Sequence, residues 1–175
     1  YMTAYETNIE NGLVVHGFNY GDWLALDGEE FKKSIFGRTD TVFLASAFYL
    51  ECLRIISDVA NVLGDVAERD YRKKHMQTLK AIRTEYVTPN GRLACDTMTA
   101  QALALSFGIV PDEFRAVTAK ALNENAEAHK YCVATGFAGT PYLLFALADN
   151  GYSETACKIL MNDGFPGWLY EVDMG

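Results

Sequence analysis

The sequence of 175 residues lacks the short motifs that carry most nucleotide and nucleophile chemistry. No GxGxxG follows an expected strand, and neither a Walker loop for phosphates nor a GxSxG elbow for a serine nucleophile is present. The three histidines are scattered, and none has a serine or cysteine partner in a recognisable pattern. The sequence therefore gives no support to dinucleotide binding, phosphate-loop chemistry or nucleophilic catalysis by serine or cysteine.

A surplus of positive charge is also missing. The chain has 23 acidic and 15 basic side chains, and its formal net charge is −8. Since binding to phosphates requires a local surplus of lysine and arginine, no nucleic-acid partner is predicted. The densest basic run, residues 69–74, is flanked by and interleaved with acidic side chains, and it predicts a solvated helix face.

Paired cysteines of the CxxC type are absent. Cys52, Cys95, Cys132 and Cys157 are far apart, and no histidine lies near them at metal-ligand spacing, so neither a metal nor another cofactor is predicted. Three of the four lie in apolar helical stretches, where a free cysteine packs as a small hydrophobe. We expect structural thiols, and nothing in the sequence requires a disulfide.

No hydrophobic run is long enough to cross a bilayer. The longest is Val42 to Leu50, and no membrane partner is predicted. A signal peptide is absent as well, so the cellular location stays open. The first twelve residues have helical spacing without a capping residue ahead of them, and the last eight, WLYEVDMG, stop without a helix to close them. Both ends predict a fragment.

What the sequence does contain is a large apolar fraction with helical periodicity. Half of its residues are hydrophobic and 13% are aromatic, enough for one domain with a substantial core. An opening helix that ends near Gly12 is followed by an irregular, glycine-bearing segment over 13–39. Hydrophobic spacing, caps and glycine stops then predict helices over 40–63, 65–86, 96–107, 112–129, 141–149 and 152–162.

The predicted helices alternate in polarity. Those over 40–63, 96–107 and 141–149 are nearly all apolar, which requires burial on every side, whereas the others carry charge on one face and would cover them from outside. Three such hairpins predict an all-α fold that forms part of a two-layer ring of inner and outer helices. A solenoid of helix pairs is the alternative. A solenoid has a fixed repeat, however, and the uneven spacing and long glycine-bearing loops favour the ring.

Candidate binding residues lie in the segments that lead into the inner helices. In Gly21-Asp22-Trp23 an indole stands beside a carboxylate, which suits a carbohydrate, because the apolar face of a sugar stacks on the ring and its hydroxyls bond to the carboxylate. The alternative is that Trp23 fills the core and Asp22 caps a turn. Asp96 is likewise either a helix cap or a pocket residue. The candidates that fall at the same end of successive hairpins are Asp22, Trp23, Asp96, Thr135, Gly136, Trp168 and Glu171.

These clusters together resemble the bacterial α-L-rhamnosidases, family 78 of the glycoside hydrolases. The motifs that carry the resemblance come in the family's order and span the chain: GDWLALD (21–27), TDT (39–41), GRLACDTMTAQALAL (91–105), TGFAGTPYLL (135–144) and WLYEVDMG (168–175). The resemblance implies that residues 1–175 are a single partial domain of an (α/α)6 catalytic toroid. The implied activity is hydrolysis of terminal α-L-rhamnose, with inversion at the anomeric carbon, from glycans or glycosides.

The resemblance also implies where the catalytic carboxylates are. Inversion needs one carboxylic acid to protonate the leaving oxygen and one carboxylate to activate water. In the family, the acid lies in a stretch resembling Asp-Glu-Arg-Leu-Gly-Trp upstream of the matched region, and the base lies in a Trp-Glu-Arg stretch shortly after the Met-Gly that ends this chain. Neither motif is present, so Glu171 is not the base and the chain alone is expected to be inactive.

What carries over is a sugar-binding wall. Trp23 matches a family tryptophan that forms an aromatic wall around the rhamnose ring, and Asp22 is its supporting polar group. Met98 departs from the family pattern, where glutamine is common, and Phe165-Pro166-Gly167 stands where Tyr-Pro-Ser is more usual; either change could alter which sugar fits. Two alternatives stay open: a helical-repeat binding module without activity, and another α/α-toroid hydrolase or lyase. A partial toroid would also leave inner-helix surface uncovered, which favours self-association.

Overall fold

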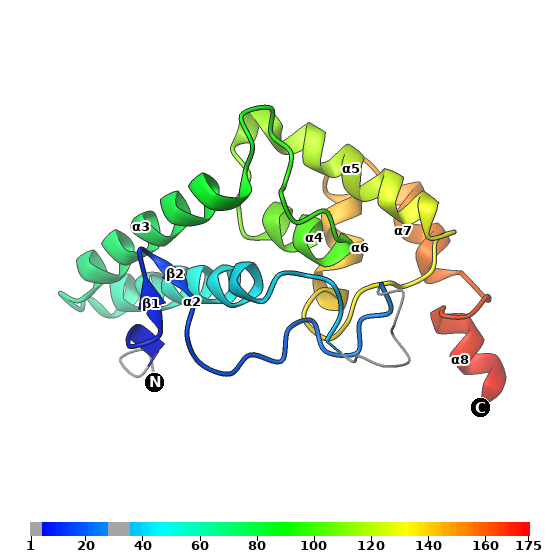
Figure 1. The fold of residues 1–175 in the computed structure, drawn as a ribbon, viewed down its shortest axis with the longest axis horizontal. Coiled ribbons are helices and arrows are strands. Elements are labelled where there is room, and N and C mark those ends of the chain that lie inside the picture. The colour runs from blue at the N-terminus through cyan, green and yellow to red at the C-terminus, as the bar shows by residue number, and fades with distance from the viewer. Residues whose placement is uncertain (1–4, 28–35) are drawn as a thin grey trace.

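The computed structural model describes residues 5–27 and 36–175. A short antiparallel hairpin, β1 (Ile9–Glu10) and β2 (Leu13–Val14), precedes α2. The helices are α2 (Thr41–Leu63), α3 (Glu68–Tyr86), α4 (Met98–Ser106), α5 (Arg115–Ala128), α6 (Thr140–Ala148), α7 (Ser153–Leu160) and α8 (Trp168–Met174), and a single 3-10 turn, η1 (Asp112–Phe114), leads into α5. Figure 1 shows this order along the chain.

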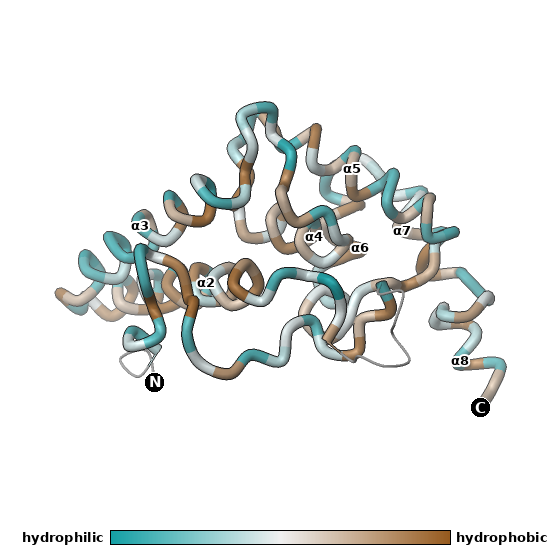
Figure 2. Tube along the Cα trace, viewed as in Figure 1, coloured by the Kyte–Doolittle hydropathy of each residue, from teal (hydrophilic) through white to brown (hydrophobic). Residues whose placement is uncertain are grey.

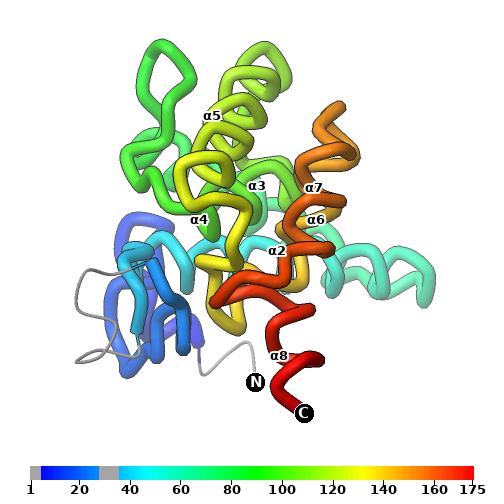
Figure 3. The backbone as a smooth tube through the Cα atoms, turned by 90° about the vertical axis from the view of Figure 1, so that its right-hand side faces the viewer, coloured from blue at the N-terminus to red at the C-terminus, as the bar shows by residue number. Residues whose placement is uncertain are grey.

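The helices form two layers, as the alternation in polarity predicts. The pairs α2–α3, α4–α5 and α6–α7 pack as hairpins, and α4 also packs against α6 (Figures 1 and 3). Eight of the nine residues of α4 are buried, whereas only Thr78 and Ile82 are buried among the 19 residues of α3. Figure 2 shows the difference as hydrophilic stretches along α3 and α5. The inner layer is α2, α4 and α6, and the outer layer is α3, α5 and α7.

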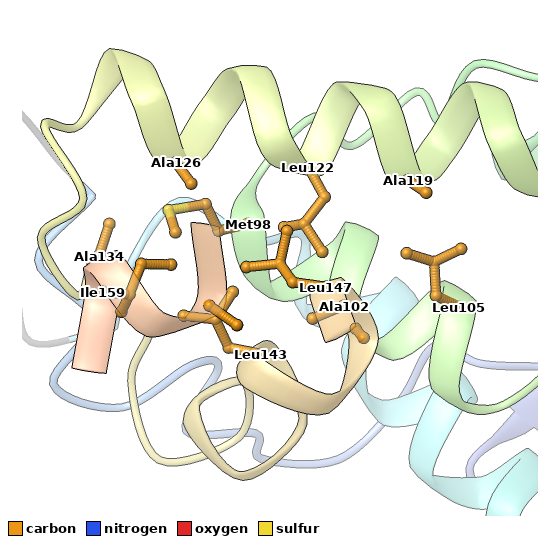
Figure 4. Close-up of a cluster of buried hydrophobic side chains, with 12 residues drawn as sticks. Met98, Ala102, Leu105, Ala119, Leu122, Ala126, Ala134, Leu143, Leu147 and Ile159 are labelled. Atoms are coloured by element: carbon orange, nitrogen blue, oxygen red, sulfur yellow. The ribbon is translucent and has the colours of Figure 1, made fainter. Parts of the chain in front are cut away.

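α4 is apolar all round because it lies between two hydrophobic cores. On one side, Met98, Ala102 and Leu105 pack with residues of α5, α6 and α7, among them Leu122, Leu143, Leu147 and Ile159 (Figure 4). On the other side, Ala100 and Ala104 pack with α2 and α3 through Phe43, Leu50 and Ile82. Full burial of a leucine or isoleucine side chain is worth about 1.5–3 kcal/mol. These two cores therefore hold the three hairpins together.

The caps of α2 agree with the sequence. The Asp40 carboxylate accepts a hydrogen bond of 2.8 Å from the Phe43 N–H at the start of the helix. Gly64 ends the helix in the left-handed conformation, with φ of 68°, and its N–H bonds back to the last turn. Asp40 is therefore the N-cap of α2.

The first part of the chain differs from the prediction. Residues 9–14 form the β1–β2 hairpin rather than the end of an opening helix, and Met2 lies outside the described residues. Asn11 and Gly12 have positive φ values of 52° and 87°, which suits the two-residue hairpin turn that Asn-Gly favours. Tyr5 and Ile9 do share an apolar surface against Tyr49. Tyr5 and Glu6 are helical, so the described part of the opening helix ends at Glu6 and not near Gly12.

The last part also differs. Residues 168–174 were expected to stop without a helix, and instead they form α8, which begins after Gly167 in an extended conformation. None of its residues is fully buried. In Figure 1 α8 lies at the edge of the molecule, beyond α7.

The cysteines are all free, and their packing is looser than expected. Cys52 on α2 and Cys157 on α7 are exposed rather than buried as small hydrophobes, and Cys95 and Cys132 are partly buried. Among the described residues, no helix is both long and apolar enough to cross a membrane. Within the same residues there is no group of three or more His, Cys, Asp or Glu side chains placed to hold a metal ion.

Candidate functional site

The segments that lead into α2, α4 and α6 meet at one end of the helices. The Thr39 and Thr97 hydroxyls are 2.7 Å apart and join the segments ahead of α2 and α4. The Asp22 carboxylate joins the Gly21-Asp22-Trp23 segment to both α4 and the segment ahead of α6. We call this edge the rim and define it as residues 21–26, 39–41, 97–99 and 135–140. The convergence predicted from the positions of the clusters is therefore present.

Asp22 is the centre of the rim, and it is completely buried. Its carboxylate accepts hydrogen bonds from the Thr99 hydroxyl and from three backbone N–H groups, those of Gly136 at 2.8 Å, Ala138 at 2.9 Å and Gly139 at 3.3 Å. A buried carboxylate needs such donors, and these ones lie at the positive ends of the α4 and α6 dipoles. Asp22 therefore holds two loops and two helices together, and its oxygens face the protein.

Glycine is required where the two loops of the rim cross. A Cβ added to Gly136 would lie 2.3 Å from the Trp23 carbonyl oxygen and 2.6 Å from the Ala25 nitrogen. One added to Gly139 would lie 2.3 Å from the Thr99 hydroxyl oxygen. The loops are also joined by a hydrogen bond of 2.9 Å from the Phe137 N–H to the Trp23 carbonyl. This close approach accounts for the glycines of the TGFAG stretch.

Trp23 lies at the surface of the rim. Its side chain is 41% exposed, so the alternative in which it fills the core is wrong. The indole stacks on the ring of Phe137, with centroids 5.5 Å apart and planes 22° apart. Asp22 beside it points inward, and the Trp23 carbonyl is tied to Phe137. The backbone that carries the indole is thus fixed while the ring itself stays accessible.

A hollow of about 490 Å³ opens between the rim and the start of α8. A volume of this size falls within the range of ligand pockets in proteins. Four of the predicted residues, Thr135, Gly136, Trp168 and Glu171, line it. The other residues that line it are Leu24, Leu26, Val133, Phe137, Thr140, Pro141, Pro166 and Gly167. Trp23 borders the hollow through its stack on Phe137. Asp22 holds the backbone next to both rings, because it precedes Trp23 and accepts hydrogen bonds from the Gly136 and Ala138 N–H groups.

Asp96 does not join this group. It lines a separate hollow of about 840 Å³ between the segment 88–96 and α5, and its main-chain carbonyl accepts a hydrogen bond of 2.8 Å from Asn125. It is not the cap of α4 either, because the hydroxyl of Thr97 accepts the capping bond from the Ala100 N–H. Asp96 is therefore not the cap of α4, and it lies outside the hollow that Thr135, Gly136, Trp168 and Glu171 line.

Several residues of the rim were not among the candidates from the sequence, and Thr99 and Leu24 are two examples. Thr99, which bonds to Asp22, and Leu24, which lines the hollow, are residue types with no distinguishing pattern around them. Only the spacing Thr97-Met98-Thr99, which places two hydroxyls at the start of an apolar helix, could have pointed to the first. Nothing in the sequence points to the second.

The hollow is largely apolar and carries little charge. Glu171 is the one carboxylate among the described residues that line it. Asp27 lies just beyond the rim, where burial raises the pKa of its carboxyl, and a hydrogen bond of 2.9 Å from the Arg38 N–H opposes that rise. Aromatic and aliphatic walls with a few hydroxyls and one carboxylate suit a neutral ligand that has apolar faces and hydroxyl groups.

Comparison with known proteins accounts for this arrangement. Residues 1–175 match the bacterial alpha-L-rhamnosidase six-hairpin glycosidase domain. The chain belongs to this family. Its alternating inner and outer helices are part of an (α/α)6 toroid, as the resemblance implied, and the solenoid alternative is excluded.

Individual relatives agree with the family assignment. The chain is 34% identical to an alpha-L-rhamnosidase of Streptomyces avermitilis over 165 residues, which is 94% of this chain and 15% of that protein. The crystal structure of the Streptomyces avermitilis enzyme complexed with L-rhamnose matches 99% of this chain with a TM-score of 0.88 and 31% identity. That of the Aspergillus terreus enzyme matches 90% with a TM-score of 0.83 and 28% identity. The chain spans 16 to 18% of these two solved chains.

Proposed function

We propose that this chain supplies one part of the catalytic toroid of a glycoside hydrolase that removes terminal α-L-rhamnose with inversion. The chain is a single partial domain in this proposal, because it spans less than a fifth of the length of its relatives. Its role is to bind the sugar: Trp23, Thr135, Gly136, Trp168 and Glu171 form the wall of the site. Asp22 holds that wall in place.

The observation that carries the proposal is the hollow at the rim. The inner helices of the toroid begin there. Thr135, Thr140 and Trp168 line a space large enough for a sugar, and Trp23 stacks on Phe137 at its edge. The similar Streptomyces avermitilis structure was solved with L-rhamnose. Rhamnose is a deoxy sugar, so it offers both hydroxyls and an apolar methyl group to a wall of this composition.

The proposal assigns no catalytic residue to this chain. Inverting hydrolysis uses two carboxyl groups about 6.5–9.5 Å apart, one as acid and one as base. Asp22 is saturated with hydrogen bonds inside the protein, and Glu171 is a single carboxylate at the start of α8. Among the described residues that line the hollow there is therefore one available carboxyl group and not a pair. We therefore expect the 175-residue chain to bind the sugar without hydrolysing its glycosides.

Two measurements on the purified chain test this proposal. Isothermal titration should show binding of L-rhamnose that is stronger than binding of D-glucose and that is lost in Trp23→Ala. Incubation with 4-nitrophenyl α-L-rhamnoside should release no 4-nitrophenol above the rate without protein. Equal binding of the two sugars would contradict rhamnose as the ligand, and steady release of 4-nitrophenol would contradict the missing catalytic pair.

A further inference from the structure

An unusual row of exposed aromatic rings leads away from the hollow. Phe137 lines the hollow and stacks on Trp23, Trp23 lies 6.1 Å from Tyr20 between ring centroids, and Tyr20 meets Phe18 edge to face at 4.7 Å. We call Phe18, Tyr20, Trp23 and Phe137 the aromatic ladder. Their exposed fractions are 79%, 60%, 41% and 67%. A contiguous exposed apolar surface of this kind marks an interaction site.

The segment that carries the ladder has its polar groups inside and its rings outside. Asn19 lies partly buried, where its side-chain amide donates to the Thr41 carbonyl at 2.8 Å and its side-chain oxygen accepts from the Gly21 N–H at 2.8 Å. Asp22 is fully buried and bonded as described above. The backbone between the rings is therefore anchored to α2 and to the rim by hydrogen bonds. Rings held outward on a fixed backbone need little ordering when a ligand binds.

The charge around the ladder restricts the ligand. Residues 13–27 contain no lysine or arginine, so this described segment itself offers no cationic side chain to a phosphate or to an acidic peptide. Both carboxylates of this stretch are already engaged, Asp22 with the rim and Asp27 with the Arg38 N–H. A neutral ligand with a flat apolar face fits a row of rings in such surroundings.

We propose that the aromatic ladder binds the part of the substrate beyond the terminal sugar, the leaving group of the hydrolysis. This rests on the proposed function, because it takes the hollow as the site of the terminal sugar. Phe137 belongs to both the hollow and the ladder, so a ligand that fills the hollow and continues past Phe137 meets Trp23, then Tyr20 and Phe18. A flat apolar face is common to a second pyranose ring and to an aromatic aglycone, and either one can stack there.

The test compares ligands that differ only beyond the terminal sugar. Affinities of the 175-residue chain are measured by ligand-observed NMR for L-rhamnose, methyl α-L-rhamnoside, 4-nitrophenyl α-L-rhamnoside and an α-L-rhamnosyl-glucose disaccharide. We expect at least one of the two larger ligands to bind about threefold to tenfold more tightly than the methyl glycoside. Tyr20→Ala and Phe18→Ala should each reduce that advantage and leave the affinity for L-rhamnose unchanged. Phe145→Ala, which removes an exposed ring from α6, should change nothing.

The outcomes separate this inference from the proposed function. If the variants Tyr20→Ala and Phe18→Ala remove the gain in affinity for the nitrophenyl glycoside alone or for the disaccharide alone, that result supports the ladder and identifies which of the two it binds. If L-rhamnose binds and the larger ligands gain no affinity, the ladder is overturned and the proposed function stands. The same holds if Tyr20→Ala lowers the affinity for all four ligands equally. If none of the four binds, both are overturned. A change from dimer to monomer in Tyr20→Ala, with no change in sugar affinity, would make the ladder a protein interface instead.

Discussion

The core around α4 and the rim around Asp22 are built in opposite ways. In the core, apolar side chains from four helices fill the interior. In the rim, a carboxylate is fully buried and aromatic rings are exposed. The core is held by burial of many apolar groups, whereas the rim depends on hydrogen bonds that converge on one side chain. Stability thus resides mainly in the helices, and the surface available for binding resides in the loops.

The largest effect is expected where the core is opened. Leu143 on α6 is fully buried among residues of four helices, so Leu143→Ala should lower the free energy of unfolding by about 2–5 kcal/mol. Leu63→Ala, at a leucine that is 75% exposed, should change it by less than about 0.5 kcal/mol. Urea unfolding followed by circular dichroism measures both. Similar losses in the two variants would mean that the described core does not hold the helices together.

A smaller loss of stability, joined to a loss of binding, is expected at the centre of the rim. Asp22→Asn replaces one acceptor oxygen by an amide N–H₂ that faces backbone N–H donors, and it should cost about 1.5–3 kcal/mol in unfolding free energy. It should also weaken L-rhamnose binding, because the loops that carry Trp23 and Gly136 separate. Asp163→Asn, at an exposed aspartate, serves as the control. Undiminished sugar affinity in Asp22→Asn would break the link between the buried carboxylate and the site.

The close crossing of the two loops gives a further prediction. In Gly136→Ala the new methyl group would collide with the Trp23 carbonyl and the Ala25 nitrogen, at a cost of about 1–3 kcal/mol. The Trp23–Phe137 stack should be displaced, and tryptophan fluorescence would report it. Gly164→Ala, where the nearest heavy atom is a side-chain oxygen at 3.1 Å, should have a smaller effect on both readings.

The exposed part of the inner layer leads to a prediction about association. Val59, Val62 and Leu63 near the end of α2 are 50%, 84% and 75% exposed. We expect the chain to self-associate as its concentration rises, and Val62→Lys to lower the average mass measured by light scattering. Asn61→Lys adds the same charge at an exposed neighbour and should have less effect. A monodisperse monomer that binds no hydrophobic dye would contradict the prediction.

The smallest expected effect is a dependence of stability on pH that arises from His75 in the outer layer. Burial lowers the pKa of His75 below its ordinary value of 6.5, opposed by the charges of Glu51 and Asp58 and assisted by that of Arg54. The unfolded chain then binds the proton more readily, so stability is full above pH 6.5 and falls as the pH drops through that value toward the pKa in the folded state. His75→Gln should flatten the decline between about pH 7 and about pH 5. If stability falls equally in His75→Gln and in the unaltered chain, the fall is caused by other titratable groups.

The difference between core and rim also explains what could be predicted from the sequence. Helices such as α4 were predictable because an apolar run that ends at a glycine is a local signal. The position of the rim was predictable because its clusters precede each inner helix. The β1–β2 hairpin was missed because Asn11-Gly12 marks a turn within a segment whose apolar residues happen to have helical spacing. The hydrogen-bond partners of Asp22 were not predictable, since Gly136 is 114 positions away and donates through its backbone.

The most direct test of the account is whether one sugar contacts both tryptophans of the chain. The sequence contains two, Trp23 and Trp168, so an ¹H–¹⁵N spectrum of the chain has two indole N–H signals, which Trp23→Phe assigns. Titration with L-rhamnose should move both signals with one common dissociation constant, because Trp168 lines the hollow and Trp23 stacks on Phe137, which lines it too. Signals that stay fixed, or that move with two different constants, would contradict a single sugar site at the rim.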